Sequence, residues 1–178
     1  MSAPMASPVI EPVIQTERLI LRRPAERDAE PYVAVFTSGR ADFMVAPGAS
    51  VRDGWRYFYT ELGHWDIRGY GMFTVTLKED DSALGMVGPW FPHTWPEREI
   101  GWMLYAGHEG QGYATEAGIA SRDWAYRALG WRTAVSYINP ENTASIRVAE
   151  RCGATLDPTA KGCDPDDLVY RHPGPEGH

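Results

Sequence analysis

Apolar and polar positions recur along this chain with both the two-residue period of strands and the spacing of helices, which predicts an α/β fold. Strand-like runs lie near residues 17–22, 72–78, 83–90, 97–105 and 133–138. Helix-like runs lie near residues 25–37, where Pro31 interrupts or delays the helix, near 51–66, from 114 onward and after Asn142. The helix over 51–66 carries an aromatic stripe that we expect to pack in the core, namely Trp55, Tyr59, Leu62 and Trp65.

The most informative segment is residues 107–116, which read Gly-His-Glu-Gly-Gln-Gly-Tyr-Ala-Thr-Glu. A strand-like stretch precedes it, and five residues follow at helical spacing: Ala114, Ala117, Ala120, Trp124 and Ala128. The first N–H groups of a helix lack an intrahelical partner, so they attract an anion together with the positive end of the helix dipole. Glycines at 110 and 112 let the backbone approach closely. This order predicts a pyrophosphate site, and the alternative is a glycine turn that binds no ligand.

A second group of polar residues follows the strand-like run at 133–138. Asn142 is placed to cap a short helix and Gly153 to end it. Plain capping is the alternative interpretation of Asn142 and Ser145, because short polar side chains are common at helix starts.

The motifs occur in a recognisable order over residues 16–156. They are Thr-Glu-Arg-Leu-Ile-Leu-Arg at 16–22, Glu-Ile-Gly-Trp at 99–102, Gly-Gln-Gly-Tyr-Ala-Thr-Glu-Ala at 110–117, and Asn142 and Ser145 followed by Cys-Gly-Ala at 152–154. Together they resemble the GNAT superfamily of acyl-CoA N-acyltransferases, in its RimJ/RimL-like branch of ribosomal-protein N-terminal acetyltransferases. Gly107 stands where this family usually has Gln or Arg, and Ala154 stands where an aromatic residue is usual.

The resemblance implies a mixed, mostly antiparallel sheet of six or seven strands flanked by about four helices. It also implies a splay between the strand ending near Tyr105 and the strand at 133–138, where acetyl-CoA binds. Its pantetheine arm is expected to pair with the backbone of Met103, Leu104 and Tyr105. Its pyrophosphate is expected on the amides of Gly110, Gln111, Gly112, Tyr113 and Ala114. Asn142 is expected to bond the pantetheine arm or orient the acyl group.

The implied chemistry is attack of a neutral primary amine on a thioester. At pH 7 an α-amine is roughly 10–20% neutral and a lysine amine less than about 0.1%, so an α-amine needs only modest help. Glu99 is the first candidate for a general base, acting directly or through water. An ion pair with Arg98 at the surface is the alternative. Ser145 is expected to assist the leaving thiolate, with Tyr137 as the second choice.

Three prolines and three aromatic residues form an irregular connection over residues 89–96. In the resembled fold this connection borders the acceptor side of the active site. The candidate walls of the acceptor pocket are therefore Trp90, Phe91, His93 and Trp95, and an aromatic lid over the core is the alternative. The acceptor is expected to be a protein N-terminus or a small molecule such as an antibiotic, polyamine or amino acid derivative. A non-catalytic acyl-CoA sensor is the other open class.

Composition indicates one domain, over residues 14–172, with tails at 1–13 and 173–178. The five histidines and two cysteines show no metal-ligand spacing, so we expect no metal and two reduced thiols. The net charge of −7 argues against nucleic-acid binding and suits a cationic acceptor, although solubility alone also explains it. No apolar stretch reaches the roughly 18 residues of a membrane span. We expect a cytoplasmic monomer or homodimer.

Overall fold

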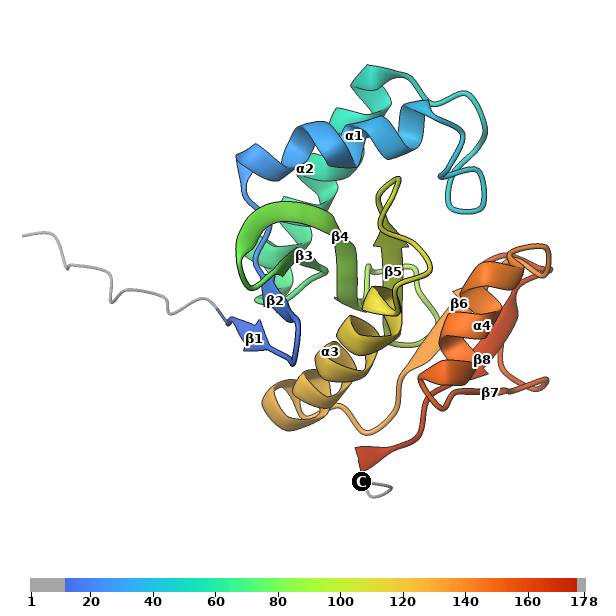
Figure 1. Cartoon of the computed structure of the whole chain (residues 1–178). Helices are drawn as coiled ribbons and strands as arrows, with labels where there is room; N and C mark the ends of the chain where they lie inside the picture. The colour runs from blue at the N-terminus through green and yellow to red at the C-terminus, as the bar shows by residue number, and fades with distance from the viewer. Residues whose placement is uncertain (1–11, 176–178) are drawn as a thin grey trace, which may run out of the picture.

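The structure is a computed structural model that describes residues 12–175. Nearly all of the expected N-terminal tail and the last three residues of the expected C-terminal tail lie outside the described residues. The described part forms one sheet in the order β1-β2-β3-β4-β5-β6-β8-β7 (Figure 1). Its strands are β1 (Ile14–Gln15), β2 (Leu19–Arg22), β3 (Phe73–Leu77), β4 (Asp80–Trp90), β5 (Glu99–Leu104), β6 (Val135–Ile138), β7 (Thr155–Leu156) and β8 (Leu168–Arg171).

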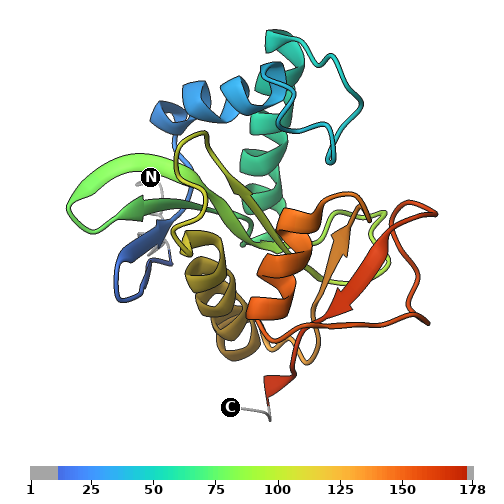
Figure 2. The ribbon, with the colours of Figure 1, turned by 45° about the vertical axis from the view of Figure 1, so that its right-hand side comes forward.

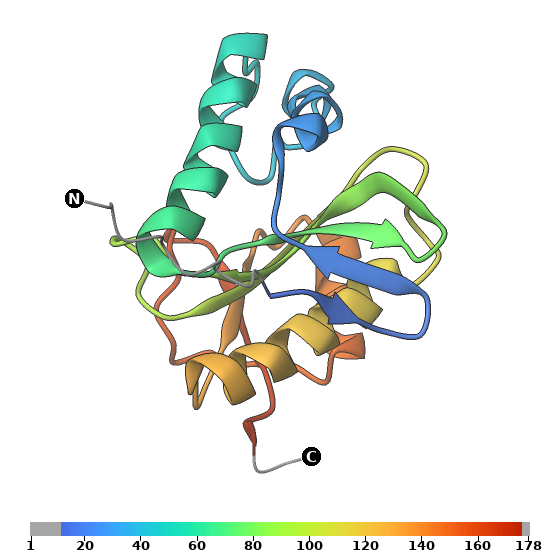
Figure 3. The same ribbon diagram turned by 90° about the vertical axis from the view of Figure 1, so that its left-hand side faces the viewer.

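Four α-helices and one short 3-10 helix cover the two faces of this sheet. They are η1 (Glu26–Asp28), α1 (Ala29–Thr37), α2 (Val51–Arg68), α3 (Tyr113–Leu129) and α4 (Thr143–Arg151). Helices α1 and α2 lie on one side of the sheet and α3 on the other (Figure 3), and α4 lies beside α3 (Figure 2). Every neighbouring pair of strands is antiparallel except β5 and β6. The predicted α/β class and mostly antiparallel sheet are therefore confirmed, and two strands of two residues each bring the described strands to eight.

The ends of the helices follow from local chemistry. Ser50 caps α2, because its hydroxyl accepts the amide of Asp53 while the Asp53 carboxylate accepts the amide of Ser50. Gly69 ends the helix in the left-handed conformation, with φ of 75°. The expected helix over 25–37 is divided into η1 and α1, so Pro31 falls in the first turn of α1, where its missing N–H costs no hydrogen bond.

The predicted core face of α2 was wrong in detail. Trp65 is buried but Tyr59 is 61% exposed, and the buried face instead includes Phe58 and Glu61. The direction in which the helix packs on the sheet decides which face is buried. The helix predicted after the glycine loop is present as α3, where Ala117 is buried and Ala128 is exposed.

The splay between β5 and β6 is present. The two strands pair in parallel only through Glu99 and Val135, and they diverge beyond that point. The amide of Val135 donates to the carbonyl of Arg98 at 2.9 Å at the closed end. Beyond it, the edges of both strands are left with backbone groups that face the gap between them.

Candidate active site

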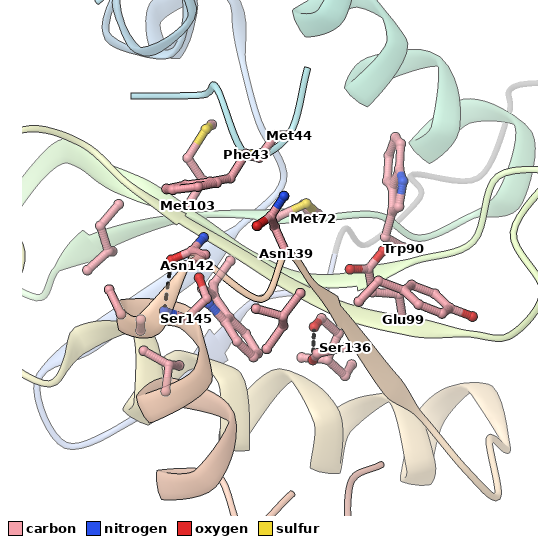
Figure 4. A pocket seen from close by; sticks show the side chains of 18 of the residues that line it. Phe43, Met44, Met72, Trp90, Glu99, Met103, Ser136, Asn139, Asn142 and Ser145 are labelled. Atoms are coloured by element: carbon pink, nitrogen blue, oxygen red, sulfur yellow. Dashed lines mark hydrogen bonds between the residues drawn. The ribbon is translucent and has the colours of Figure 1, made fainter. Parts of the chain in front are cut away.

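A cavity of about 1000 Å³ lies at this splay. Its lining residues come from α1, α2, the ends of β4 and β5, the loop at 109–115, β6, α4 and the segment at 163–167. Figure 4 shows Asn142 and Ser145 on one side of the cavity, Glu99 and Trp90 on the other, and Asn139 and Met72 between them. One cavity therefore connects the predicted cofactor segment with the predicted catalytic carboxylate.

The glycine loop has the geometry of an anion site. Gly110 and Gly112 both have positive φ, at 76° and 82°, and Gly112 is the N-cap of α3. The first intrahelical bond runs from the amide of Glu116 to the carbonyl of Gly112, so the amides between them have no partner within the helix. Gly110, Gly112 and Ala114 line the cavity. These unpaired amides and the helix dipole favour an anionic group at this end of the cavity.

Gln111 and Tyr113 are not among the lining residues of the cavity, and their contacts lie within the loop itself. The Tyr113 hydroxyl donates to Gln111 Oε1 at 3.1 Å, and the Gln111 carbonyl accepts Arg18 Nη1 at 3.0 Å. Arg18 also pairs with Glu116 at 2.7 Å and lies 4.8 Å from the centre of the Tyr113 ring. The turn before β2 thereby holds the start of α3 in place. A contribution of Gln111 and Tyr113 to cofactor binding would come from their main chain.

Strand β5 presents one of the three predicted pantetheine-pairing residues to the splay. The amide of Tyr105 donates to the carbonyl of Leu84, so its backbone faces β4. Because backbone groups alternate along a strand, those of Leu104 point the other way, toward the splay. The carbonyl of Leu104 accepts Arg40 Nη2 at 3.4 Å, and Arg40 also pairs with Glu109 of the glycine loop. Met103 and Leu104 line the cavity, whereas Tyr105 is buried outside it.

Asn142 and Ser145 lie together on the α4 side of the cavity. The Asn142 side chain caps α4 by accepting the amide of Ser145 at 3.1 Å, as the capping interpretation predicted (Figure 4). The Ser145 hydroxyl accepts Trp102 Nε1 at 3.1 Å. Because that bond uses only a lone pair, the hydroxyl hydrogen can still donate into the cavity.

Glu99 is half-buried in the cavity wall, directly opposite Trp90 in the β4–β5 ladder. Its Oε2 accepts Trp95 Nε1 at 2.6 Å. Burial raises the pKa of Glu99 to about 7, and hydrogen bonds from Trp95 and from the backbone of Tyr137 limit that rise. The guanidinium group of Arg98, which was the alternative partner for Glu99, lies over the rings of Phe91 and Trp131. A carboxylate with a pKa near 7 can accept a proton at neutral pH.

Tyr137 lies on β6 and lines the same cavity. Its hydroxyl accepts the amide of Glu97 at 2.9 Å, and burial raises its pKa, so the phenol stays protonated at neutral pH. A protonated phenol can donate a proton or hydrogen bond, as the Ser145 hydroxyl can.

The aromatic connection supplies two of its four predicted wall residues. Trp90 and Trp95 line the cavity, and Trp90 stacks on His64 with ring centres 4.3 Å apart. Phe91 and His93 are not brought to the cavity. The amide of Phe91 donates to His64 Nε2 and its ring lies under two guanidinium groups, while His93 is exposed. Both residues follow the end of β4 at Trp90, in an irregular segment where no strand period fixes the direction of a side chain.

A second carboxylate reaches the cavity from α2. Glu61 is 8% exposed, and its Oε1 accepts the hydroxyl of Tyr32 at 3.3 Å. Its Oε2 is buried without a hydrogen-bond partner among the described residues. Burial raises the pKa of Glu61 to about 8, the bond from Tyr32 limits the rise, and the charge of Glu99 adds to it. Glu61 and Glu99 are therefore close enough to interact electrostatically.

The comparisons with known proteins agree with this geometry. A family model described as the acetyltransferase (GNAT) domain matches residues 18–155. The chain belongs to the GNAT acetyltransferase family. The acetyltransferase from Agrobacterium tumefaciens str. C58 is 40% identical in sequence, with a TM-score of 0.85 over 97% of this chain and 99% of that one. YkkB of Bacillus subtilis (strain 168) is 33% identical over 118 residues, which are 62% of this chain and 68% of that protein.

A more distant structure shares the fold of this GNAT acetyltransferase. RimJ of Mycobacterium smegmatis, in complex with CoA-disulfide, has a TM-score of 0.67 at 19% identity, covering 90% of this chain and 85% of that one. The predicted family is thus confirmed, and the likeness to RimJ is one of fold.

Three residues of this GNAT site were missed by sequence reasoning: Glu61, Tyr32 and Arg40. The position of Glu61 offered a usable signal, because it lies three residues after Phe58 and four before Trp65, on the buried face of α2. A carboxylate in such a position is either paired or functional. Tyr32 and Arg40 carry no comparable signal in the sequence.

Metal and membrane features add no further site. Within residues 12–175, no group of three or more His, Cys, Asp or Glu side chains is arranged to hold a metal ion. The described cysteines, Cys152 and Cys163, are free thiols. No helix in the described range has the length and apolarity that a membrane crossing requires.

Proposed function

We propose that this GNAT acetyltransferase transfers an acetyl group from acetyl-CoA to a primary amine by direct attack, with Glu99 as the general base. The observation that carries the proposal is the single cavity that joins the glycine-loop amides to a half-buried carboxylate with a pKa near neutrality. The coenzyme supplies a thioester, and its pyrophosphate would lie on the amides of residues 110–114. The backbone of Leu104 and the side chain of Asn142 would hold the pantetheine arm.

Glu99 would remove the proton from the ammonium group of the acceptor, directly or through water. The free amine then forms the C–N bond as the C–S bond breaks. The sulfur leaves as a thiolate and takes up the second proton that the nitrogen loses, which gives the amide and the CoA thiol. Ser145 would donate a hydrogen bond to that thiolate from the α4 wall, with Tyr137 as the alternative donor on β6. A site of this kind works by positioning the amine and by matching the pKa of its base to the working pH.

The test is product analysis. The protein is incubated with acetyl-CoA and a mixture of peptides and small primary amines, and acetylated products are identified by mass spectrometry. Transfer to one class of amine supports the proposal and separates a protein N-terminus from a small molecule. Binding of CoA without any acetylated product would show instead a non-catalytic acyl-CoA sensor.

A further inference from the structure

The acceptor end of the cavity contains a buried oxygen that the proposed reaction does not use. Glu61 lines the cavity, and its Oε2 is buried without a hydrogen-bond partner among the described residues. A buried carboxylate oxygen without a partner is costly, and native structures retain one where a ligand supplies the missing group. Tyr32 satisfies only the other oxygen of this carboxylate.

The surroundings of Glu61 indicate the charge of that ligand. The titratable groups around it are Tyr32 of α1, Tyr105 after β5 and Glu99 of β5, which are all acidic or neutral. Arg40, the cation that lines the α1–α2 side, is paired with Glu109 at the cofactor end. A carboxylate-bearing acceptor would therefore meet repulsion here, whereas an ammonium group would meet an unpaired acceptor and aromatic walls.

One ammonium does not satisfy both carboxylates during the reaction. Glu99 takes a proton from the reacting ammonium group, so that amine is already neutral when it attacks. Glu61 lies on a different element, α2, and takes no part in this proton transfer, so it can give up its own proton and pair with a second cation. Glu61, Met72 and Glu99 all line the same cavity of about 1000 Å³. A cavity of this size has room for a slender chain between the two carboxylates.

Building on the proposed function, we infer that the acceptor is a small diamine, whose second ammonium group pairs with Glu61 while its first amine reacts beside Glu99. Glu61 is then a specificity-determining residue that positions the acceptor. The aromatic and apolar side chains around it, including Tyr32 and Met72, would contact the methylene chain.

The test compares two matched acceptors, the four-carbon α,ω-diamine and n-butylamine, in steady-state acetylation. For the wild-type protein, kcat/KM for the diamine should exceed that for the monoamine by about tenfold or more. Glu61→Gln should lower the diamine value on the order of 10²-fold, mainly through KM, and change the monoamine value less than about threefold, since a lost buried charge pair affects only the ligand that makes it. Glu30→Gln, which removes an exposed carboxylate of α1 outside the cavity, is the control.

The Glu61→Gln protein should fold, because glutamine resembles the protonated form that burial already favours. Equal use of the two acceptors by the wild-type protein, or an equal loss of both in Glu61→Gln, would overturn the inference. Calorimetry with CoA present gives a readout independent of turnover. Titrations at pH 7 in buffers of different ionisation enthalpy measure how many protons are released on binding. The diamine should release more protons than the monoamine, and Glu61→Gln should remove that difference. Glu61-dependent diamine binding without acetyl transfer would refute the proposed function and leave standing only the pairing of the second ammonium group with Glu61.

Discussion

The two halves of the cavity are built in different ways. The cofactor half consists of backbone: amides after Gly110 and Gly112, the start of α3 and the exposed edge of β5 at the splay. The acceptor half consists of side chains from elements far apart in sequence, such as Glu61 of α2, Trp90 of β4 and Glu99 of β5. Backbone geometry tolerates changes of side chain, whereas a side-chain pocket changes with each substitution. Under the proposed function, the first half would fix the donor and the second half would select the acceptor.

The largest expected effect lies in the acceptor half. Glu99→Gln keeps the shape of the side chain but loses its basicity, so the rate near neutrality should fall on the order of 10²-fold or more. The wild-type rate should rise with pH through about 7, the pKa of Glu99. The loss in the variant should shrink at higher pH, where the free amine needs no base. Stopped-assay rates across the pH range measure both effects.

The variant Trp95→Phe tests the assignment of Glu99 as the base. The Nε1–H group of Trp95 stabilises the charged form of Glu99 by a hydrogen bond. Removal of this bond should raise the pKa of Glu99 and move the rise of the rate to higher pH. A Glu99→Gln protein with the wild-type pH profile would place the base elsewhere.

The second prediction concerns the cofactor half. Gly112→Val should weaken CoA binding by about tenfold or more, because a branched side chain blocks close approach to the amides. The substitution also strains a residue at φ of 82°, and its Cβ would lie 3.4 Å from Arg18 Nη2. Gly130→Val is the matched control, since Gly130 ends the same helix at φ of 67° with open space around it. Calorimetry of CoA binding that gave the same loss in both variants would assign the effect to strain.

The backbone half of the cavity was also easier to predict from the sequence than the side-chain half. The glycine loop and the Asn142 cap depend on local backbone patterns that residues 107–117 and 139–145 contain, whereas the splay was implied by the family resemblance. The sequence could not show which of the four predicted wall residues face the cavity. An irregular chain with prolines has no period from which to assign the direction of Phe91 or His93. Glu61 was missed because the core face of α2 was assigned through Tyr59 and Leu62, although the spacing of Glu61 from Phe58 and Trp65 placed it on the buried face.

The third prediction concerns Ser145, on the α4 side of the cavity. Ser145→Ala should lower turnover by about tenfold while CoA affinity stays within about threefold, because a bond to the leaving thiolate is made mainly in the transition state. Ser145→Thr retains a hydroxyl and is the matched control. Comparable CoA affinity in both, measured by calorimetry, would separate a role in chemistry from the loss of the partner of Trp102. An unchanged turnover in Ser145→Ala would transfer the role to Tyr137.

The smallest expected effect is on stability, and it again contrasts the two halves. Glu61 has a folded-state pKa raised to about 8, so the native state binds more protons than the unfolded state between about pH 4.5 and 8. The free energy of unfolding should therefore fall as pH rises through this window. His64 and His172, whose pKa values burial lowers, oppose this trend below about pH 6.5.

The Glu61→Gln variant isolates the contribution of this one carboxylate. Relative to the wild-type protein, the variant should be little changed at pH 5 and more stable at pH 8, by on the order of 2 kcal/mol or roughly 4–8 °C in Tm. Thermal unfolding of the ligand-free proteins at the two pH values measures the difference. A variant whose advantage does not grow with pH would show that Glu61 is ionised in the empty site. In that case the acceptor half would already be charged before the amine arrives, as the cofactor half is through its helix dipole.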